Sequence, residues 1–446
     1  MLNIHTVVRI LMRSLFLTSH KKILSKLNNH IVKNTGWLFL EKILKIFGGL
    51  ILGLWMAKYL GPENYGLLNY SIAFVALFEP LSTLGLHKIV VRDLVNQPER
   101  HYQILGTSFI LRIFAGALIA VIAIDVNLWM RPDDLISSWL VAFSALGLVL
   151  KTSDIISFWF LSQVQAKQNA IAGSIAYTVG STIRAGLLLV KTSVLTFGIA
   201  SLLEQLIRSY RLGVSYTKVG KSFKEWKFNV TQAKALLKQS WPLILSGIAV
   251  TVYMHIDQVM LSQIAGNRAV GIYSVAVRLS ESWYFIPVAI ASSTFPMILA
   301  AKQQSQDKYY QQIHKLFKTV VSISYLLVVP LTLLAQPLVI LLLGRTYSGA
   351  GFVLSIHVWS GIFVSLGVIR ELWMTSENLM VFSFMTTVSG AVLNIILNYL
   401  LIPEYQEIGA AIATLLSYFL AAFLSCFIIR ETRPIARLMA SALILR

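Results

Sequence analysis

Long apolar runs separated by short polar segments dominate this chain. Windows of roughly 18 to 25 residues have the length of a helix that crosses a bilayer. They lie near 35–59, 66–87, 104–125, 136–162, 169–190, 194–213, 240–263, 270–297, 314–335, 350–372, 380–401 and 408–429. Six windows fall in each half of the chain, so the pattern predicts an all-α polytopic membrane protein of about twelve transmembrane helices. An even number of crossings places both termini on one side.

A weak internal repeat relates the two halves. The copies, about 205 positions apart, are LGPENYGLLNYSIAF from Leu60 and AGNRAVGIYSVAVRL from Ala265. They share two glycines at the same spacing, Gly61 and Gly66 in the first copy and Gly266 and Gly271 in the second. Two halves repeated in the same orientation are typical of a transporter that rocks one half against the other around a central site. We therefore expect two six-helix bundles, over 34–213 and 240–429, around a central cavity.

The segments outside the bundles are basic. They are an N-terminal segment over 1–33, interpreted as an interfacial helix that is not cleaved, a Lys-rich linker over 214–239, and a tail over 430–446. With the N-terminus inside, these segments and most other Lys and Arg residues fall on the inner side, as the positive-inside rule requires. The sequence thus predicts a multi-pass protein of the plasma (inner) membrane with both termini cytoplasmic.

Composition agrees with the membrane assignment and excludes several classes. The chain is 56% hydrophobic and 13% charged, with a mean hydropathy of +0.71, whereas soluble domains have about 25% charged residues. Topology accounts for the formal charge of +19, so nucleic acid is not an expected partner. Cys426 is the single cysteine, and neither a metal-ligand spacing nor a phosphate-binding loop is present. We expect no cofactor, no metal and no ATP hydrolysis.

Ionisable residues inside the apolar windows carry the chemistry. Each costs roughly 2.5 to 3.5 kcal/mol at a helix centre, so residues on this many helices are expected to face a shared hydrated interior. The candidate anion-binding residues are Lys45, Arg112, Lys151, Arg184 and Arg278. The candidate ion-coupling or gating residues are Glu41, Asp154, Asp257 and Glu281.

Spacing along single helices suggests which of these charges neutralise each other. Glu41–Lys45, Lys151–Asp154, Arg278–Glu281 and Glu204–Arg208 are three or four positions apart and share a helix face. Such pairs can serve transport, or they can simply make the helices insertable. Arg112 and Arg184 have no partner on their own helix, and a guanidinium matches phosphate oxygens well. They are therefore better candidates for holding an anion.

Asp257 and Glu281 have a second candidate role in coupling transport to an ion gradient, because membrane carboxylates often bind protons or cations. For Asp257 the alternative is a helix-end cap. His255 and His357 have no acidic partner one turn away and are expected to be hydrogen-bonded interior histidines. Gly49 and Gly53 form a G-x-x-x-G spacing that favours close helix packing.

Four segments resemble the polysaccharide and O-antigen flippases of the multidrug, oligosaccharidyl-lipid and polysaccharide exporter superfamily. They are LGPENYG from Leu60, QSWPLILSGIAVTVYMHIDQVMLSQIAGNRAVGIYSVAVRLSESW from Gln239, LLGRTYSGAGFVLSI from Leu342 and NIILNYLLIPEYQEIGAAIATLLSY from Asn394. The resemblance implies two six-helix bundles that move polyprenyl-diphosphate-linked oligosaccharide from the cytoplasmic to the outer leaflet by alternating access. It also implies that Lys45, Arg112 and Arg278 match basic residues at the midplane of the family. Glycan polymerase or export proteins are candidate partners beside the lipid-linked cargo and the bilayer.

Other functions stay open at this level. An ion-coupled multidrug or small-solute exporter of the same superfamily would favour an acidic, aromatic pocket. A polytopic glycan polymerase or ligase would be expected to have a large external loop, whereas the external stretch near Asp125 to Leu135 is short. A scaffold without transport is a third alternative. The expected protein is a transporter that makes and breaks no bonds.

Overall fold

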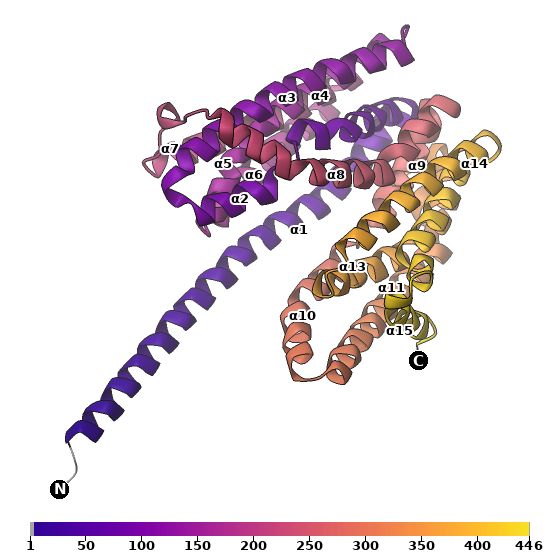
Figure 1. Ribbon diagram of the computed structural model, residues 1–446. Helices are drawn as coiled ribbons and strands as arrows, with labels where there is room; N and C mark the ends of the chain where they lie inside the picture. The colour runs from indigo at the N-terminus through magenta and orange to yellow at the C-terminus, as the bar shows by residue number, and fades with distance from the viewer. Residues whose placement is uncertain (1–3, 446) are drawn as a thin grey trace.

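The computed structural model describes the backbone of residues 4–445 and the side chains of residues 41–445, and this part of the chain is helical without strands (Figure 1). The α-helices of the first half are α1 (Ile4–Thr83), α2 (His87–Asn96), α3 (His101–Met130), α4 (Leu135–Leu150), α5 (Asp154–Ser162), α6 (Ala166–Val190) and α7 (Val194–Lys218). Those of the second half are α8 (Val230–Ile264), α9 (Gly266–Glu281), α10 (Phe285–Gln304), α11 (Gln306–Leu343), α12 (Gly349–His357), α13 (Ser360–Ser376), α14 (Met380–Ala422) and α15 (Arg433–Leu443). Short 3-10 turns are η1 (Pro98–Arg100), η2 (Lys151–Ser153), η3 (Phe223–Glu225), η4 (Arg345–Tyr347), η5 (Leu424–Phe427) and η6 (Arg430–Thr432).

Within the described residues, nine helical stretches are long and apolar enough to cross a membrane. This confirms an all-α polytopic membrane protein. Two of the stretches, Glu41–Asn96 and Met380–Phe427, have 56 and 48 residues, more than twice the roughly 20 needed for one crossing. Each contains a break in helical backbone, at Gly61 and at Gln406. The charged helix α7 lies outside the nine. The arrangement of twelve spans in two bundles stays a prediction. The two breaks agree with it, because each divides one long stretch into two.

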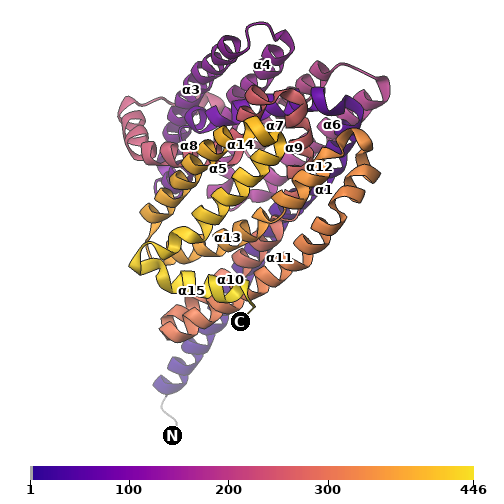
Figure 2. The same cartoon turned by 90° about the vertical axis from the view of Figure 1, so that its right-hand side faces the viewer.

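The helices form two groups that meet at one end (Figure 1). α1 to α7 make up the first group and α9 to α15 the second, while α8 packs against both α1 and α14. The groups approach each other near α9 and diverge toward the opposite end. From the side, α11, α13 and α14 run side by side in the second group (Figure 2).

The repeat seen in the sequence forms the junction between the groups. Gly61 and Gly266 both have positive φ, 71° and 84°, and each precedes a helical segment. A Cβ added to Gly66 would overlap the carbonyl of Asn267, and one added to Gly271 would overlap the carbonyl of Pro62. These two contacts are equivalent under the 205-residue offset of the repeat. The two copies therefore pack against each other with matching close approaches that only glycine permits.

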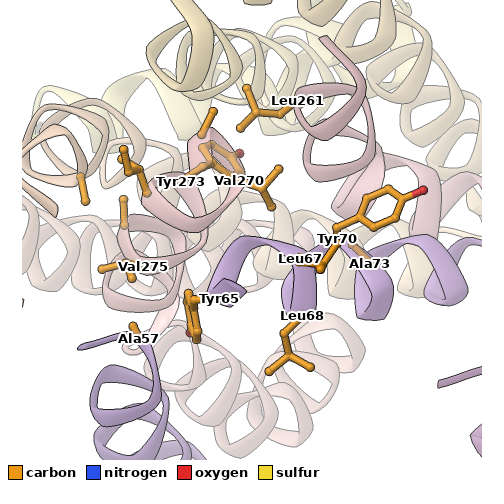
Figure 3. Packing of buried hydrophobic residues seen from close by; sticks show 14 of the residues in the cluster. Ala57, Tyr65, Leu67, Leu68, Tyr70, Ala73, Leu261, Val270, Tyr273 and Val275 are labelled. Carbon is orange, nitrogen blue, oxygen red and sulfur yellow. The ribbon is translucent and has the colours of Figure 1, made fainter. Parts of the chain in front are cut away.

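Buried apolar side chains fill the space around this junction (Figure 3). Tyr65 and Leu68 come from α1, and Val270, Tyr273 and Val275 come from α9. Tyr65, Val270, Tyr273 and Val275 are at most 1% exposed. The largest apolar core of the described residues thus includes the place where the two repeat copies meet.

Arg131, directly after α3, ties the first group to the α8–α9 turn. Its Nη2 donates to the carbonyl and hydroxyl oxygens of Ser262, at 3.0 and 2.6 Å. Its Nη1 donates to Asn267 Oδ1 at 3.0 Å, and the guanidinium carbon lies 4.1 Å from the centroid of the Tyr70 ring. We call the end that holds the repeat junction and this Arg131 clasp the closed end.

Much of the sequence predicted to lie between or outside the bundles is helical. The predicted boundary at residue 34 falls inside α1, and the interfacial role expected for 1–33 rests on side chains outside the described residues. In the linker, α7 runs to Lys218 and α8 begins at Val230. The residues between them dock on α3, where Lys227 N donates to Tyr102 O at 3.2 Å and Asn229 N donates to Thr107 Oγ1 at 3.1 Å. The connector is thus a fixed strap on the first group.

Candidate functional site

Three neighbouring cavities share lining residues, and we name each after one arginine. The Arg184 cavity is lined by the first group alone, whereas the other two also have residues of α8 or α9 in their lining. The Arg112 cavity has about 670 Å³, the Arg184 cavity about 580 Å³ and the Arg278 cavity about 400 Å³. Glu79, Asp154 and Arg208 line both the Arg112 and Arg184 cavities. Lys45 and Ile72 line both the Arg184 and Arg278 cavities. The three cavities are therefore neighbours with shared lining residues, and together we call them the polar region.

The order of the cavities follows from which residues of α1 and α8 line each one. On α1, residues 79–83 line the Arg112 cavity and residues 69–73 line the Arg278 cavity. On α8, residues 243–251 line the first and residues 255–258 the second. Both helices then continue to the closed end. The Arg278 cavity therefore lies directly below the closed end, and the Arg112 cavity lies toward the end where the groups diverge.

Both halves of the chain build the Arg278 cavity. Arg278 on α9 reaches across to α1, where its Nη1 donates to Gly49 O at 3.0 Å. A Cβ on Gly53 would overlap the guanidinium, so the G-x-x-x-G spacing forms a slot for this side chain. That corrects the expected role of Gly49 and Gly53 in helix packing, because the neighbour that needs the space is Arg278 rather than a helix backbone. The remaining polar lining residues are Lys45, Asn69, His255, Gln258, Ser274, Glu281 and Ser282.

Arg278 and Glu281 line the same cavity without an ion pair between them in the described part of the chain. The pair predicted from their spacing is therefore wrong, because the Arg278 side chain extends into the slot on α1 instead of along its own helix. His255 also differs from expectation, since its Nδ1 is buried without a hydrogen-bond partner. The Arg278 cavity thus combines two cations, Lys45 and Arg278, with a carboxyl group and several hydrogen-bonding groups.

The Arg112 cavity holds a buried cation whose hydrogen-bonding capacity is partly unused. Arg112 is 2% exposed, and its Nε and Nη1 have no hydrogen-bond partner among the described residues. The guanidinium carbon lies 5.6 Å from the centroid of the Phe158 ring. The His87 ring also contacts the Phe158 ring in a tilted arrangement, with the ring centroids 4.7 Å apart. Arg112 has no ion-pair partner on its own helix, as its spacing indicated, and no carboxylate of the described residues forms an ion pair with it. Its role in binding an anion stays a prediction.

Ion pairs surround the Arg184 cavity. They are Lys45–Glu41 at 2.6 Å, Lys151–Glu79 at 2.7 Å, Arg184–Glu204 at 2.8 Å, and Arg208–Asp154. The predicted Glu41–Lys45 pair is present. The predicted Lys151–Asp154 and Glu204–Arg208 pairs are wrong, because each of these four residues binds a partner on a neighbouring helix. Helices packed 8 to 10 Å apart bring such partners within reach of long side chains.

Arg184 is the main correction among the predicted anion-binding residues. It has no partner on α6, as the spacing indicated, but Glu204 on α7 neutralises it and Ser201 Oγ accepts from its Nη2 at 3.2 Å. Gly180 leaves room for the Glu204 side chain of this pair, because a Cβ at position 180 would lie 3.0 Å from Glu204 Cβ. Of the five predicted cations, Arg112 and Arg278 are left without a carboxylate within ion-pair distance in the described structure.

Asp257 lies outside the three cavities. It is 6% exposed and accepts hydrogen bonds from the Tyr273 hydroxyl and from Gln258 N, the latter at 2.7 Å. Thr414 Oγ1 on α14 lies 3.5 Å from it. His357 is hydrogen-bonded to Ser280 Oγ at 2.9 Å, as expected for an interior histidine. The ion-coupling roles of Asp257, Glu281, Glu41 and Asp154 stay predictions.

Sequence reasoning missed several residues that line the cavities. Arg208 was considered as a partner of Glu204, although it pairs with Asp154 in the cavity lining. His87, Asn69 and Gln258 are uncharged and therefore escaped a search for buried charges. The sequence could have indicated these residues as polar side chains on the same helix faces as the buried charges.

The fold and the polar region define a polytopic helical membrane protein with a cation-bearing cavity between two groups of helices. A family model described as "Polysaccharide biosynthesis protein" matches residues 31–302, and a second one, MatE, matches residues 242–400. The chain belongs to the polysaccharide biosynthesis protein family. This confirms the resemblance drawn from the four sequence segments.

Named relatives point to transport. The chain is 29% identical over 224 residues to a probable low-salt glycan biosynthesis flippase of Haloferax volcanii, covering 49% of this chain and 46% of the relative. It is 32% identical over 210 residues to a probable flippase of the same organism, covering 44% and 42%. The chain thus spans less than half the length of these two relatives. A putative O-antigen transporter of Shigella flexneri is 23% identical over 74% of this chain and 77% of its own. The names agree with a transporter and not with an enzyme.

Solved structures share the fold. An inward-facing multidrug resistance transporter of the MATE family superposes with a TM-score of 0.70 at 16% identity, covering 89% of this chain and 96% of its own. The lipid II flippase MurJ, in an inward closed conformation, superposes with a TM-score of 0.64 at 15% identity, covering 93% and 91%. At these identities the likeness establishes the fold alone.

Proposed function

We propose that the chain is a flippase that moves polyprenyl-diphosphate-linked oligosaccharide from the cytoplasmic to the outer leaflet by alternating access. The observation that carries this proposal is Arg278, a cation from the second half that reaches into a glycine slot of the first half. A ligand bound there contacts both halves at once, so it can favour one arrangement of the halves over the other. The two relatives named as flippases support this class of transport, and one of the names adds glycan biosynthesis.

The chemistry of the polar region fits such a headgroup. A diphosphate is bound well by guanidinium or ammonium groups, and among the described residues the Arg112 and Arg278 guanidinium groups have no carboxylate within ion-pair distance. Sugars need amides and hydroxyls, which Asn69, Gln258 and Ser274 supply in the Arg278 cavity. The prenyl chain would stay in the bilayer where the two groups diverge.

The closed end would face the outside of the plasma membrane in this proposal. The turns at that end carry Glu63, Asp133 and Asp134. Lys and Arg residues gather at the other end, in the strap and in the α10–α11 turn, which the positive-inside rule assigns to the cytoplasm. Both termini would then be cytoplasmic, and the polar region would be reached from the side where lipid-linked sugars are made.

Reconstitution tests the proposal. Purified protein in liposomes is given a fluorescent polyprenyl-diphosphate oligosaccharide in one leaflet, and its arrival in the other is followed by quenching. Arg278→Ala should lower the transfer rate at least ten-fold, because a charge-assisted hydrogen bond contributes about 1.5 to 3 kcal/mol. Arg268→Ala, an exposed arginine on the same helix, is the matched control and should transfer at the wild-type rate.

An absence of transfer by the wild-type protein, or unchanged transfer by Arg278→Ala, contradicts the proposal.

A second candidate function, an ion-coupled multidrug exporter, is favoured by one observation, the Glu281 carboxyl that lines the Arg278 cavity without an ion-pair partner in the described residues. Efflux of a cationic dye that is lost in Glu281→Gln, with no transfer of the lipid-linked sugar, would support that candidate instead.

A further inference from the structure

The lining of the Arg112 cavity is partly charged and partly apolar. The basic side chains are His87, Lys88, Arg112 and Arg208, the carboxylates are Glu79 and Asp154, and the apolar side chains include Leu86, Phe158, Leu161, Leu243 and Val250. Lys151 and Arg208 neutralise the two carboxylates, and the Nε and Nη1 donors of Arg112 have no partner among the described residues, although burying a cation without a partner is costly. A ligand that brings an anion next to an apolar chain would satisfy both the free donors and the apolar part of the lining.

The Arg112 and Arg278 cavities are too far apart for one diphosphate to fill both. Their lining residues are centred about ten positions apart on α1 and on α8, which corresponds to roughly 15 Å along a helix at 1.5 Å per residue. A diphosphate, whose phosphorus atoms share one bridging oxygen, is much shorter than this. The two unpaired guanidinium groups therefore belong to two separate stations.

Between the stations lies a wall of ion pairs. Lys151–Glu79 and Arg208–Asp154 line the Arg184 cavity, and Glu79, Asp154 and Arg208 also face the Arg112 cavity. The carboxylates of these ion pairs repel an anion unless a nearby cation offsets their charge. An anion held by Arg112 would hence remain on the diverging side until the wall rearranges.

We propose that the Arg112 cavity is a loading site that binds the diphosphate and the first isoprenoid units of a membrane lipid before the headgroup reaches Arg278. This inference rests on the proposed function for its place in transport, but the binding itself does not require the lipid to carry a particular sugar. Arg112 with His87 and Lys88 holds the phosphates, and Val250 with Leu243 contacts the chain. Arg278 acts at the later station.

Binding measurements separate the two stations. The full chain in nanodiscs of zwitterionic lipid is titrated with tritiated farnesyl diphosphate, with inorganic pyrophosphate, and with farnesol, which has the chain without the charge. Wild-type protein should prefer farnesyl diphosphate over both other probes. Arg112→Ala should weaken its binding ten-fold or more, and Arg112→Gln should do the same if the alanine variant folds poorly. Arg100→Ala, an exposed arginine in η1, is the control and should bind normally.

Two further variants test the details. Val250→Thr, at a side chain that is 41% exposed, should weaken the binding of farnesyl diphosphate several-fold and leave the binding of pyrophosphate unchanged. Arg278→Ala should bind farnesyl diphosphate within about three-fold of wild type while losing transfer in liposomes. Normal binding by Arg112→Ala, or an equal loss in Arg278→Ala, overturns the inference. Binding at Arg112 in a wild-type protein that transfers no lipid-linked sugar would instead overturn the proposed function and leave the binding site standing.

Discussion

At the scale of single residues, the cations of the polar region differ in what neutralises them. Lys45, Lys151, Arg184 and Arg208 each have a carboxylate at ion-pair distance. Such pairs reduce the cost of placing charge in a membrane, and they leave little charge for a ligand. Arg112 and Arg278 lack such a partner in the described structure. The cost of burying them is offset only when an anion arrives, so these two residues are the ones that bind cargo in our account.

Gly53 offers a test of this account that leaves every charge in place. A Cβ at this position overlaps the Arg278 guanidinium, so Gly53→Ala should push Arg278 out of its slot and lower the transfer rate at least ten-fold. Protein yield and thermal stability should change little, because alanine favours helix over glycine by about 1 kcal/mol. The control is Gly186→Ala, where an added Cβ meets nothing within 4 Å. Normal transfer by Gly53→Ala would show that the slot position is unimportant.

At the scale of elements, the repeat junction and the Arg131 clasp hold the closed end together. The reciprocal contacts of Gly66 and Gly271 bring α1 and α9 into close backbone contact, and Arg131 adds hydrogen bonds to Ser262 and Asn267 across the same boundary. Alternating access requires these contacts to separate. The glycine contacts are steric and fixed by the backbone, whereas the clasp depends on one side chain.

Arg131→Ala should therefore shift the closed end toward open forms. Spin labels on cysteines at Asp133 and Arg268, both exposed, report the distance across the clasp in a Cys426→Ser background. Because three hydrogen bonds from a guanidinium are lost, pulsed dipolar spectroscopy should show a longer and broader distance distribution in the variant. Lys191→Ala, at an exposed residue between α6 and α7, serves as the control. An unchanged distribution in Arg131→Ala would mean that the glycine junction alone keeps this end closed.

At the scale of the whole molecule, apolar windows and the glycine repeat were sufficient to predict a helical polytopic protein. The spacing of charges predicted Glu41–Lys45, since residues on one helix face meet regardless of the fold. It could not predict Lys151–Glu79 or Arg184–Glu204, because these pairs depend on which helices become neighbours. The Arg278 slot was missed for the same reason, since Gly53 and Arg278 are joined only by the packing of the two halves.

The central claim is that the closed end must open for cargo to cross. In the Cys426→Ser background, cysteines at Asp133 and Arg268 can be joined by a short bismaleimide, and transfer of lipid-linked sugar in liposomes is then measured. We predict that the cross-linked protein transfers nothing above empty liposomes, whereas each single-cysteine variant treated with the same reagent transfers normally. Transfer at the wild-type rate by the cross-linked protein would contradict the account.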